Sequence, residues 1–557
     1  MKHTFSALDR SKHLQDMEQV QYDLLVIGGG ITGAGIALDA QSRGLQTALI
    51  EMQDFAAGTS SRSTKLVHGG LRYLKQFEVA MVAEVGKERA IVYENGPHVT
   101  TPEWMILPIY VGGTFGKFTT SIGLRVYDFL AGVKKQERRR MLNVQETLSK
   151  LPTLKTDGLK GAGYYVEYRT DDARLTLEVM KQAVHLGAKA VNYVKADKFI
   201  YRDNRIIGVE AVDQITGGVY AIYAKKVINA TGPWVDTLRE KDQSKEGKTL
   251  HLTKGIHLVL DGGRFPLQHS VYFDTTDGRM IFAIPRNGKT YIGTTDTNYK
   301  GDIAHPRMTE EDQDYLLQAV NSMFPQFNLV AGDVESSWTG LRPLIHQEGK
   351  DPSQISRKDE IFHSASGLIS IAGGKLTGYR LMAETIVNHV AKQLSENGHR
   401  PYPASGTKHL PISGGDVGGS EQYNQYVEER VIEGQRLGLS EVDARLLVLR
   451  YGSNIDQLFA GVDMYRQEAE QYGLPLHLVL SIVYSIEHEM AVSPVDFFVR
   501  RTGALYFDMP FVQEWRIPVI EYMSQKLSWN DAQLQAYSGE LDEEIDAAIV
   551  AFNPSFG

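Results

Sequence analysis

Residues 22–51 read YDLLVIGGGITGAGIALDAQSRGLQTALIE, and this stretch predicts how the N-terminal part of the chain folds. An apolar run ends in the glycine motif Gly28-x-Gly30-x-x-Gly33, a helix-compatible stretch follows, and a second apolar run closes on Glu51. Strand, glycine turn, helix, strand and acid together form the unit that binds an adenine dinucleotide. Because these elements flank the glycines, dinucleotide binding is favoured over an ordinary glycine-rich loop.

The residues of this motif have separate roles. Gly28 permits the tight turn, Gly30 lets the backbone approach a pyrophosphate, and Gly33 lets the helix lie close on the strand. The N-terminus of the helix offers N–H groups and a partial positive charge to the phosphates. Glu51, 18 residues after Gly33, can accept hydrogen bonds from ribose hydroxyls. The motif by itself does not distinguish a nicotinamide dinucleotide from a flavin dinucleotide.

The composition is that of a large globular protein. With 557 residues, 42% hydrophobic and 23% charged, the chain is long enough for more than one folding unit. Its net charge of −9 argues against a nucleic-acid partner. It has no cysteine, which excludes disulfides, thiolate metal sites and a cysteinyl flavin link, and no other pattern suggests a metal site. The first 20 residues lack the apolar stretch of a signal peptide, and no apolar run approaches the roughly 20 residues of a membrane span.

A linker divides the chain into an α/β part and a helical part. Residues 401–420 (PYPASGTKHLPISGGDVGGS) are dense in Pro, Gly and Ser. Strands are expected before it at 205–212, 226–230, 256–260, 280–284, 290–294 and 368–372, and helices after it at 422–437, 440–451, 476–489 and 529–552. The expected units are a polar N-terminal extension (1–20), an α/β body (21–395), a linker (396–420) and a helical domain (421–557).

Three further segments favour a flavin. A strand runs into Ala230-Thr231-Gly232, a later strand ends in Gly373-Gly374-Lys375 before a helix, and Gly58-Thr59-Ser60-Ser61-Arg62-Ser63 follows the second strand of the dinucleotide unit. The second glycine pair offers another backbone N–H cradle, and the small residues of the third segment suit a ribityl chain and pyrophosphate. Taken singly, each has an ordinary explanation as a strand exit, a turn or a surface loop.

The string SSRSTKLVHGGLRYL at 60–74 resembles the signature of FAD-dependent glycerol-3-phosphate dehydrogenases of the aerobic, respiratory type. The strings NATGPW (229–234), IGTTD (292–296), GLRPL (340–344) and GGKLT (373–377) match that family in the same order. The resemblance covers residues 20–395, and the helical tail is similar more loosely. The broader class is similar to glycine oxidase and D-amino-acid oxidase.

The resemblance implies a two-part, Rossmann-like FAD-binding fold of the glutathione-reductase and D-amino-acid-oxidase type. It carries a substrate-capping antiparallel sheet and a C-terminal all-helical domain. The FAD-binding part would use residues 21–80, 160–255 and 340–395, and the substrate cap residues 85–160 and 256–340. The FAD-binding residues implied are Gly28, Gly30, Gly33, Glu51, Ser60, Ser61, Ala230, Thr231, Gly232, Gly373, Gly374, Leu376 and Thr377.

The reaction implied is oxidation of sn-glycerol 3-phosphate at C2 to dihydroxyacetone phosphate in glycerol catabolism. Hydride goes to flavin N5, and electrons then pass to a membrane quinone. The location implied is cytoplasmic, peripherally associated with the inner face of the cell membrane. The amphipathic helices of the tail could serve a homodimer, a lid or stability alone.

The implied catalytic residues include the cations that a phosphate dianion requires. Arg342 and Arg357 would clamp the phosphate. Arg72, Tyr73 and Lys375 would hold the glycerol oxygens and polarise the new ketone. His68 is either the base for the C2 hydroxyl or a structural histidine, and the sequence weighs these two roles equally.

Two segments are candidates for contact with an anionic lipid surface. Residues 122–133 (IGLRVYDFLAGV) place apolar residues at helical spacing, and the cations Lys134, Lys135, Arg138, Arg139 and Arg140 follow. The run from Trp104 to Val111 is strongly apolar. A core-packed helix with a solvated basic tail accounts for the first segment equally well.

Four other functions share parts of this pattern. They are a glycerol-3-phosphate oxidase that uses O2, an amino-acid oxidase of the same fold, a non-catalytic flavin-binding protein and a nicotinamide dehydrogenase. The arginines suited to phosphate argue against the amino-acid oxidase, and a bound yellow chromophore would exclude the nicotinamide enzyme.

Overall fold

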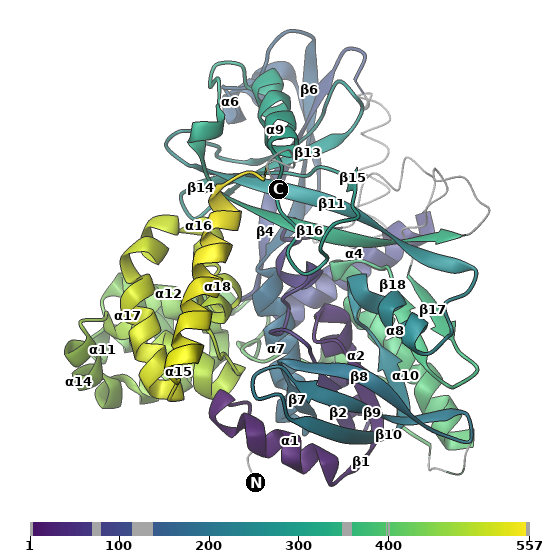
Figure 1. The fold of residues 1–557 in the computed structure, drawn as a ribbon. Helices are drawn as coiled ribbons and strands as arrows, with labels where there is room; N and C mark the ends of the chain where they lie inside the picture. The colour runs from purple at the N-terminus through teal and green to yellow at the C-terminus, as the bar shows by residue number, and fades with distance from the viewer. Residues whose placement is uncertain are drawn as a thin grey trace.

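The computed structural model describes residues 4–68, 79–113, 137–347, 359–396, 398 and 401–552. Its described part consists of two β-sheets, each covered by helices, and a C-terminal group of helices that lies along one side of both (Figure 1). The description of the fold as α/β with a helical C-terminal unit is therefore confirmed.

The first sheet holds the dinucleotide motif. Its described strands are β1 (Gln21–Ile27), β2 (Thr47–Ile50), β7 (Lys189–Val191), β8 (Val194–Arg202), β9 (Arg205–Asp213), β10 (Val219–Asn229), β17 (Glu360–His363) and β18 (Ile369–Ala372). Strands β18, β10, β1, β2 and β7 are neighbours in this order and run parallel. Their carboxyl ends therefore meet at one edge, which is where open parallel sheets bind ligands.

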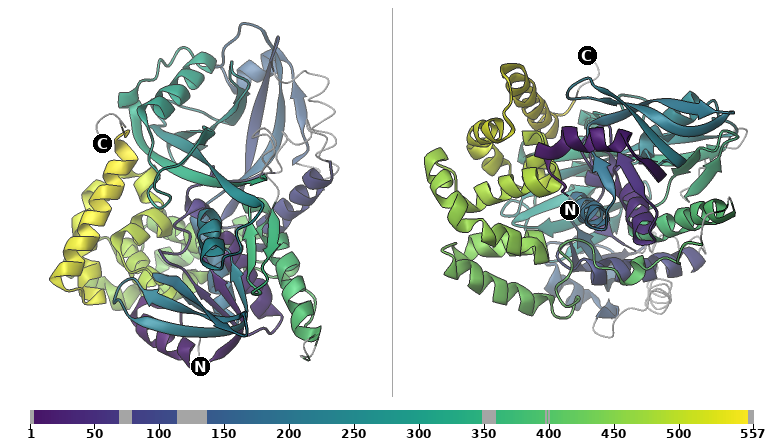
Figure 2. Two further views of the ribbon diagram at one scale, coloured as in Figure 1. Left: turned by 45° about the vertical axis from the view of Figure 1, so that its right-hand side comes forward. Right: turned by 90° about the horizontal axis from the view of Figure 1, so that it is seen from below.

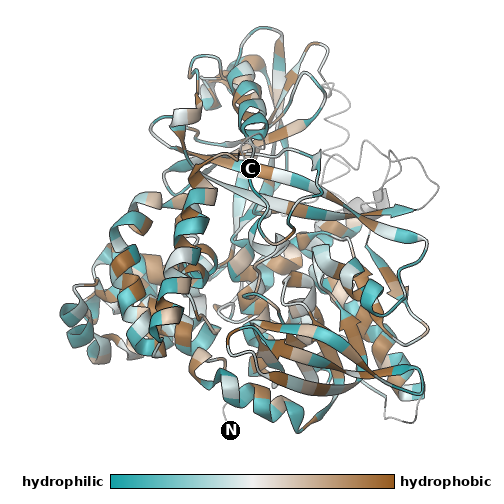
Figure 3. Ribbon diagram, viewed as in Figure 1, coloured by the Kyte–Doolittle hydropathy of each residue, from teal (hydrophilic) through white to brown (hydrophobic). Residues whose placement is uncertain are grey.

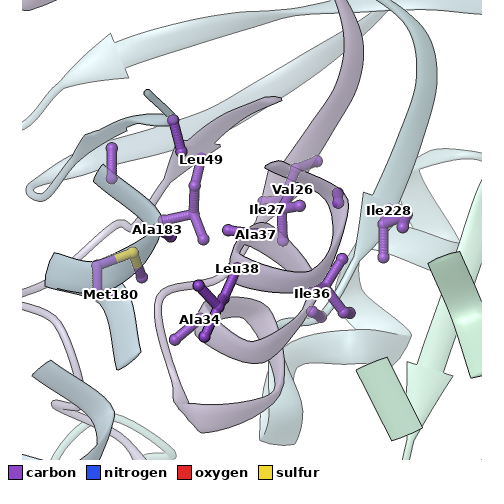
Figure 4. Close-up of a cluster of buried hydrophobic side chains, with 14 of the residues drawn as sticks. Val26, Ile27, Ala34, Ile36, Ala37, Leu38, Leu49, Met180, Ala183 and Ile228 are labelled. Atoms are coloured by element: carbon purple, nitrogen blue, oxygen red, sulfur yellow. The ribbon is translucent and has the colours of Figure 1, made fainter. Parts of the chain in front are cut away.

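Helix α2 (Ile31–Ser42) packs on β1 and β2, between α7 (Asp172–His185) and α10 (Tyr379–Glu396). Figure 4 shows the contact, in which apolar side chains of α2 meet those of β1, β2, β10 and α7. Gly35 makes room for α10, because a Cβ there would lie 2.9 Å from the Tyr379 ring. Burial of both faces explains why β1 reads as an apolar run and does not alternate.

The second sheet is mostly antiparallel. Its described strands are β3 (Leu66–Val67), β4 (Thr100–Tyr110), β5 (Arg140–Leu142), β6 (Leu159–Thr170), β11 (Lys248–Asp261), β12 (Ser270–Asp274), β13 (Met280–Arg286), β14 (Lys289–Gly293), β15 (Thr297–Asn298) and β16 (Val334–Gln347). Strands β6 and β16 pair here, with β4 and β11, although the sequence suggested that residues from 160 and from 340 onward belong with the first sheet. Pairing partners distant in sequence decide this membership, which no local pattern reports.

The other α-helices in the described residues of the α/β part are α1 (Arg10–Glu18), α4 (Val79–Asn95), α6 (Val144–Lys150), α8 (Val235–Lys241) and α9 (Glu310–Met323). Helix α9 covers one face of the second sheet, where Leu316 and Val320 are fully buried. The C-terminal helices cover the opposite face, where Trp338 of β16 packs in one apolar cluster with Phe507.

The C-terminal unit consists of α11 (Tyr423–Arg436), α12 (Glu441–Tyr451), α13 (Ile455–Ala460), α14 (Val462–Tyr472), α15 (Leu476–Glu489), the π-helix η10 (Asp496–Arg501), α16 (Ala504–Phe507), α17 (Met509–Leu527) and α18 (Asp531–Ile549). Hydrophilic and hydrophobic segments alternate along these helices (Figure 3). The expected strands and C-terminal helices all overlap observed ones. Ser440 caps α12 by accepting a hydrogen bond from the N–H of Asp443.

The N-terminal segment is more than a polar extension. Helix α1 lies against β7 and β10, with Leu14 and Met17 fully buried (Figure 2, right). Arg10 pairs with Asp213 at 2.6 Å and donates to the carbonyl oxygen of Asn192 at 2.7 Å. Burial acts to raise the pKa of Asp213, but hydrogen bonds from Arg10 and Thr216 outweigh it and hold this pKa below its ordinary value.

The two candidate membrane segments have different outcomes. The run from Trp104 to Val111, a candidate for lipid contact by its apolar composition, is packed inside the protein for most of its length. Most of it forms β4, where Met105, Ile106 and Leu107 are buried in the sheet cores, and only Val111 is strongly exposed. Residues 122–133 lie outside the described part of the chain. None of the described helices has the length and apolar character needed to cross a bilayer.

Replacement of Arg10 should destabilise the fold. Arg10→Ala leaves the buried Asp213 carboxylate without its guanidinium, and we expect the free energy of unfolding at pH 7 to fall by about 3 kcal/mol in urea denaturation. Because the pKa of Asp213 is depressed in the folded state, the ion pair stabilises the fold above about pH 4 and loses this effect as the pH falls further. The difference in unfolding free energy between wild type and Arg10→Ala should therefore become smaller in acid. The exposed Lys12 of the same helix is the control, since Lys12→Ala should leave stability unchanged. Equal stability of Arg10→Ala and Lys12→Ala would contradict this account.

Candidate cofactor and substrate site

A cavity of about 850 Å³ lies at the carboxyl ends of the parallel strands. Glu51, Ala230 and Gly373, which follow β2, β10 and β18 directly, line it together with the glycine turn after β1. Residues of the second sheet, such as Arg342 of β16, line it as well. The cavity therefore joins the dinucleotide motif to the cap that the sequence predicts for the substrate.

Steric limits enforce the glycine turn. Gly28 has φ 113°, and a Cβ there would lie 2.5 Å from the carbonyl oxygen of Ala230. A Cβ on Gly33 would overlap the carbonyl oxygen of Gly28. Gly30 is the N-cap of α2, so the N–H groups of the first turn face this edge of the sheet. One of them, the N–H of Ile31, donates to the hydroxyl of Ser60 at 2.9 Å.

Glu51 stands where the ribose acceptor is expected. Its carboxylate accepts hydrogen bonds from the N–H of Gly29 at 2.6 Å and from the N–H of Gln53 at 2.8 Å. Burial raises the pKa of this carboxyl above its ordinary value, against those two hydrogen bonds. Each carboxylate oxygen can accept more than one hydrogen bond, so the group can also receive a ribose hydroxyl.

The second cradle consists of two left-handed glycines. Gly373 and Gly374 have φ 77° and 80°, and a Cβ on Gly374 would overlap the sulfur of Met382. A short helical turn from Leu376 to Gly378 follows and leads into α10. Backbone N–H groups of such a turn can stabilise negative charge in the cavity.

His68 is tied to this second cradle through its backbone. Its N–H donates to the hydroxyl of Thr377 at 3.1 Å, and that hydroxyl lies 3.2 Å from the carbonyl oxygen of His68, to which it donates. Burial, followed by the positive charges of Lys375 and Arg89, lowers the pKa of the imidazole to about 3. His68 is therefore neutral near pH 7, and at this pKa its imidazole is a weak base.

Arg342 is held at the cap side of the cavity. Its guanidinium donates to the hydroxyl of Thr294 at 2.9 Å and to the carbonyl oxygen of Thr295 at 3.1 Å, and it lies 3.3 Å from a carboxylate oxygen of Asp296. Gly255 makes room for it, because a Cβ there would lie 2.5 Å from a guanidinium nitrogen. The IGTTD and GLRPL strings of the sequence thus meet at one arginine.

Most of the predicted residues meet in this one cavity. Those that line it are Gly28, Gly30, Glu51, Ser60, His68, Ala230, Thr231, Gly232, Arg342, Gly373, Gly374, Lys375, Leu376 and Thr377. Gly33 lies at the helix–strand contact. The side chain of Ser61 is buried away from the lining, and its carbonyl oxygen accepts from Lys65 at 2.9 Å. Arg72, Tyr73 and Arg357 lie outside the described residues.

Sequence reasoning missed several lining residues. Arg279, at the turn between β12 and β13, lines the cavity, and a hairpin turn carries no signal for this position. His257 of β11 also lines it, with its ring stacked on Trp338 at 4.7 Å and its Nε2 lying 3.0 Å from the hydroxyl of Thr64. Burial, Arg342 and Lys65 hold the pKa of His257 well below its ordinary range.

The charge of the cavity differs from that of the chain. Six described lining residues are cationic (Arg62, Lys195, Lys241, Arg279, Arg342 and Lys375), and four are acidic (Glu51, Glu167, Asp277 and Asp296). The whole chain carries −9. The cavity therefore favours anionic ligands locally. Within the described residues, no group of three or more His, Asp or Glu side chains could hold a metal ion.

Known families and relatives match nearly the whole chain. The model of the family described as FAD dependent oxidoreductase matches residues 23–380, and that of the C-terminal domain of alpha-glycerophosphate oxidase matches residues 405–534. The aerobic glycerol-3-phosphate dehydrogenase of Bacillus subtilis (strain 168) is 62% identical over 550 residues, 99% of either chain. The enzyme of the same name in Staphylococcus aureus (strain USA300) is 56% identical over 547 residues, 98% of either chain.

Solved structures extend the comparison. The glycerol-3-phosphate dehydrogenase of Bacillus halodurans complexed with FAD matches with a TM-score of 0.86 and 51% identity, and the match covers 99% of each chain. The L-alpha-glycerophosphate oxidase of Mycoplasma pneumoniae with FAD bound has a TM-score of 0.55 at 16% identity, over 70% of this chain and 99% of that one, a likeness of fold alone. The resemblance visible in the sequence is confirmed: the chain belongs to the FAD-dependent oxidoreductases and, among them, to the family of the aerobic glycerol-3-phosphate dehydrogenases.

Proposed function

We propose that the chain uses FAD to oxidise sn-glycerol 3-phosphate at C2 to dihydroxyacetone phosphate and passes the electrons to a membrane quinone. The observation that carries this proposal is the position of Arg342. Its guanidinium is held by Thr294 and Thr295 in the same cavity that contains both backbone cradles. A fixed arginine beside a dinucleotide site suits a substrate that carries a phosphate.

The residues present fit FAD. The turn at Gly28 and Gly33 leaves no space for side chains, as close approach of a pyrophosphate requires. Glu51 can receive the ribose, and the second cradle at Gly373 and Gly374 lies in the same cavity. Its volume of about 850 Å³ is within the range of cofactor sites, roughly 300–1,000 Å³. When bound, FAD supplies the hydride acceptor at its N5.

The residues of the chain then have three tasks. Arg342 binds the phosphate and fixes the substrate relative to the cofactor. Lys375, at the second cradle, holds the oxygen on C2 and favours negative charge there. His68 takes the proton of the C2 hydroxyl. Its imidazole is neutral before the substrate arrives, and a nearby phosphate dianion raises its affinity for that proton. Arg72, Tyr73 and Arg357 complete this proposal as further substrate-binding residues.

The electron acceptor separates this proposal from its nearest rival, the oxidase that uses O2. The relatives that are 56–62% identical over nearly the full chain bear the name dehydrogenase, whereas the glycerophosphate oxidase is 16% identical. We therefore propose a quinone acceptor, with a cytoplasmic enzyme that docks peripherally on anionic lipid through residues 122–140. A homodimer and the division of the body into FAD-binding and cap parts belong to the same proposal.

Anaerobic spectroscopy tests the reaction directly. The purified protein should be yellow, and excess sn-glycerol 3-phosphate should bleach its flavin absorbance in the absence of air, because hydride transfer reduces the flavin. Glycerol, which lacks the phosphate, is the matched control and should leave the spectrum unchanged. Rapid reoxidation by a soluble quinone but slow reoxidation by air is expected. If sn-glycerol 3-phosphate does not change the flavin spectrum, the proposal is wrong. Fast reoxidation of the reduced flavin by air would favour the oxidase.

Replacement of Arg342 should weaken substrate binding. Loss of one charge-assisted phosphate contact costs roughly 2–3 kcal/mol, so Arg342→Ala should raise KM about 30-fold or more while FAD stays bound. The matched control is Arg264→Ala, since Arg264 belongs to the same cap but pairs with Asp333 outside the cavity lining. Steady-state kinetics with a dye acceptor measures both variants. Unchanged kinetics in Arg342→Ala would remove this residue from the site.

The kcat of a His68 variant separates the two roles of His68, whereas the acid limb of the pH profile does not. Since the pKa of His68 in the free protein is about 3, its imidazolium forms only in strong acid. An acid limb of kcat/KM near pH 6 should therefore come from the substrate phosphate, whose second pKa is about 6, and should persist in His68→Gln. Loss of the base should lower kcat by about 100-fold or more in that variant. A loss of less than tenfold with FAD retained would leave His68 a structural role only.

A further inference from the structure

The loop formed by residues 51–61 makes one wall of the cavity. Glu51 and Ser60 of this loop line the cavity. Asp54 and Phe55 do not line it, and both side chains are 0% exposed. The front of the loop thus belongs to the cofactor site, while its back is buried in the protein.

The back of the loop touches the glycine turn after β1. The N–H of Ala56 donates to the carbonyl oxygen of Gly29 at 3.1 Å. The Phe55 ring fills the space beside Gly29, where a Cβ would lie 2.6 Å from Phe55 Cδ1. Ala56 has φ 64°, an unfavourable backbone conformation for alanine that persists only when neighbouring contacts impose it. The shape of the turn therefore depends on what holds the loop from behind.

Two arginines of the C-terminal unit hold Asp54. Arg501 donates from both terminal nitrogens to its carboxylate, at 2.6 and 2.8 Å, and Arg500 donates from Nε at 2.5 Å. Asn192 adds a fourth hydrogen bond at 2.9 Å. Both arginine side chains are almost fully buried, at 0% and 6% exposure. A two-pronged guanidinium–carboxylate contact fixes orientation as well as distance.

The arginines are themselves fixed within the C-terminal unit. Arg500 pairs with Asp496 at 2.6 Å, and Arg501 donates to the carbonyl oxygen of Glu489 at 2.8 Å. Both arginines belong to the π-helix η10, a rare geometry that is frequent at functional sites. The contact therefore connects a rigid element of the helical unit to the cofactor loop.

We propose that Arg500 and Arg501 are positioning residues of the FAD site. Through Asp54 they hold the 51–61 loop against the glycine turn, so that the C-terminal helical unit completes the cofactor site. The proposal rests on the FAD site of the proposed function and is independent of the substrate. The C-terminal unit also contacts β16, the strand that carries Arg342. The hydroxyl of Ser336 in β16 donates to the carbonyl oxygen of Tyr506 at 2.5 Å.

The test measures FAD binding and loop order in variants of the full chain. Arg501→Met removes the two-pronged contact and keeps much of the side-chain volume. Its FAD dissociation constant should rise at least tenfold, and amide hydrogen exchange of residues 52–60 in the FAD-free protein should quicken while that of β10 stays unchanged. Arg501→Lys keeps the positive charge but loses the two-pronged guanidinium contact. Its FAD dissociation constant and its loop exchange rate should therefore lie between those of the wild type and Arg501→Met.

Asp54→Asn provides a second test from the other side of the contact and keeps the side-chain shape if Arg501→Met fails to fold. It should weaken FAD binding and loosen the loop in the same way. The double variant of Asp54→Asn and Arg501→Met should lose no more FAD affinity than the weaker-binding single variant, because both changes act on one contact. Arg516→Met is the control in the same unit, since Arg516 pairs with Asp542 at the exposed surface, and it should change neither measurement.

The outcomes are separable. Wild-type FAD affinity and loop exchange in folded Arg501→Met or Asp54→Asn would overturn the positioning role while leaving the FAD site intact. Lower thermal stability of these variants with unchanged FAD affinity would also overturn the positioning role, because the arginines would then contribute to stability alone. A wild-type chain that binds no FAD would overturn the cofactor site itself and this proposal with it.

Discussion

The close approach of helix α2 to strands β1 and β10 is the constraint on which the site depends. Gly28 and Gly33 leave no room for a Cβ, so the first turn of α2 sits directly against the strand ends. This places the N–H groups of the first helical turn and the positive end of the helix at the carboxyl edge of the sheet. The cavity follows from that edge, because Ala230 and Gly373 come after neighbouring parallel strands and must arrive at the same place.

Electrostatics adapt this cavity to anions within an acidic protein. The lining gathers more cations than acids, although the chain carries −9 overall. The Arg342 guanidinium is held by neutral oxygens of Thr294 and Thr295 and lies 3.3 Å from a carboxylate oxygen of Asp296. His68, in contrast, is kept neutral by burial and by Lys375 and Arg89. One cavity thus contains both a fixed cation and an uncharged imidazole.

The C-terminal helices are joined to the rest of the molecule by both apolar and ionic contacts. Trp338 of the second sheet packs with Phe507 of α16, and Asp54 of the loop after β2 pairs with Arg501 of η10. Burial acts to raise the pKa of Asp54, but Arg501 and Arg500 outweigh it and lower this pKa to about 2. Because a buried ion pair adds little net stability over apolar packing, its best-attested value is to specify one arrangement of the parts.

The sequence by itself determined the local units and their chemistry. The glycine motif with Glu51, the strands of the first sheet and the C-terminal helices follow from spacing and composition over short windows, and the structure agrees with them. The family strings led to Arg342 and Lys375, which do line the cavity. Short-range patterns succeed here because turns, caps and amphipathic helices are decided by neighbouring residues.

Tertiary structure alone decided how those units meet. Most of the apolar run from Trp104 to Val111 belongs to a buried strand, and a strand covered on both faces has the same composition as a segment that prefers lipid. The N–H of His68 donates to the hydroxyl of Thr377, which is 309 positions away in the sequence, and Asp54 pairs with Arg501, which is 447 positions away. No local sequence pattern predicts contacts over such separations. Long-range packing sets them, because they arise only when separate elements are buried against one another.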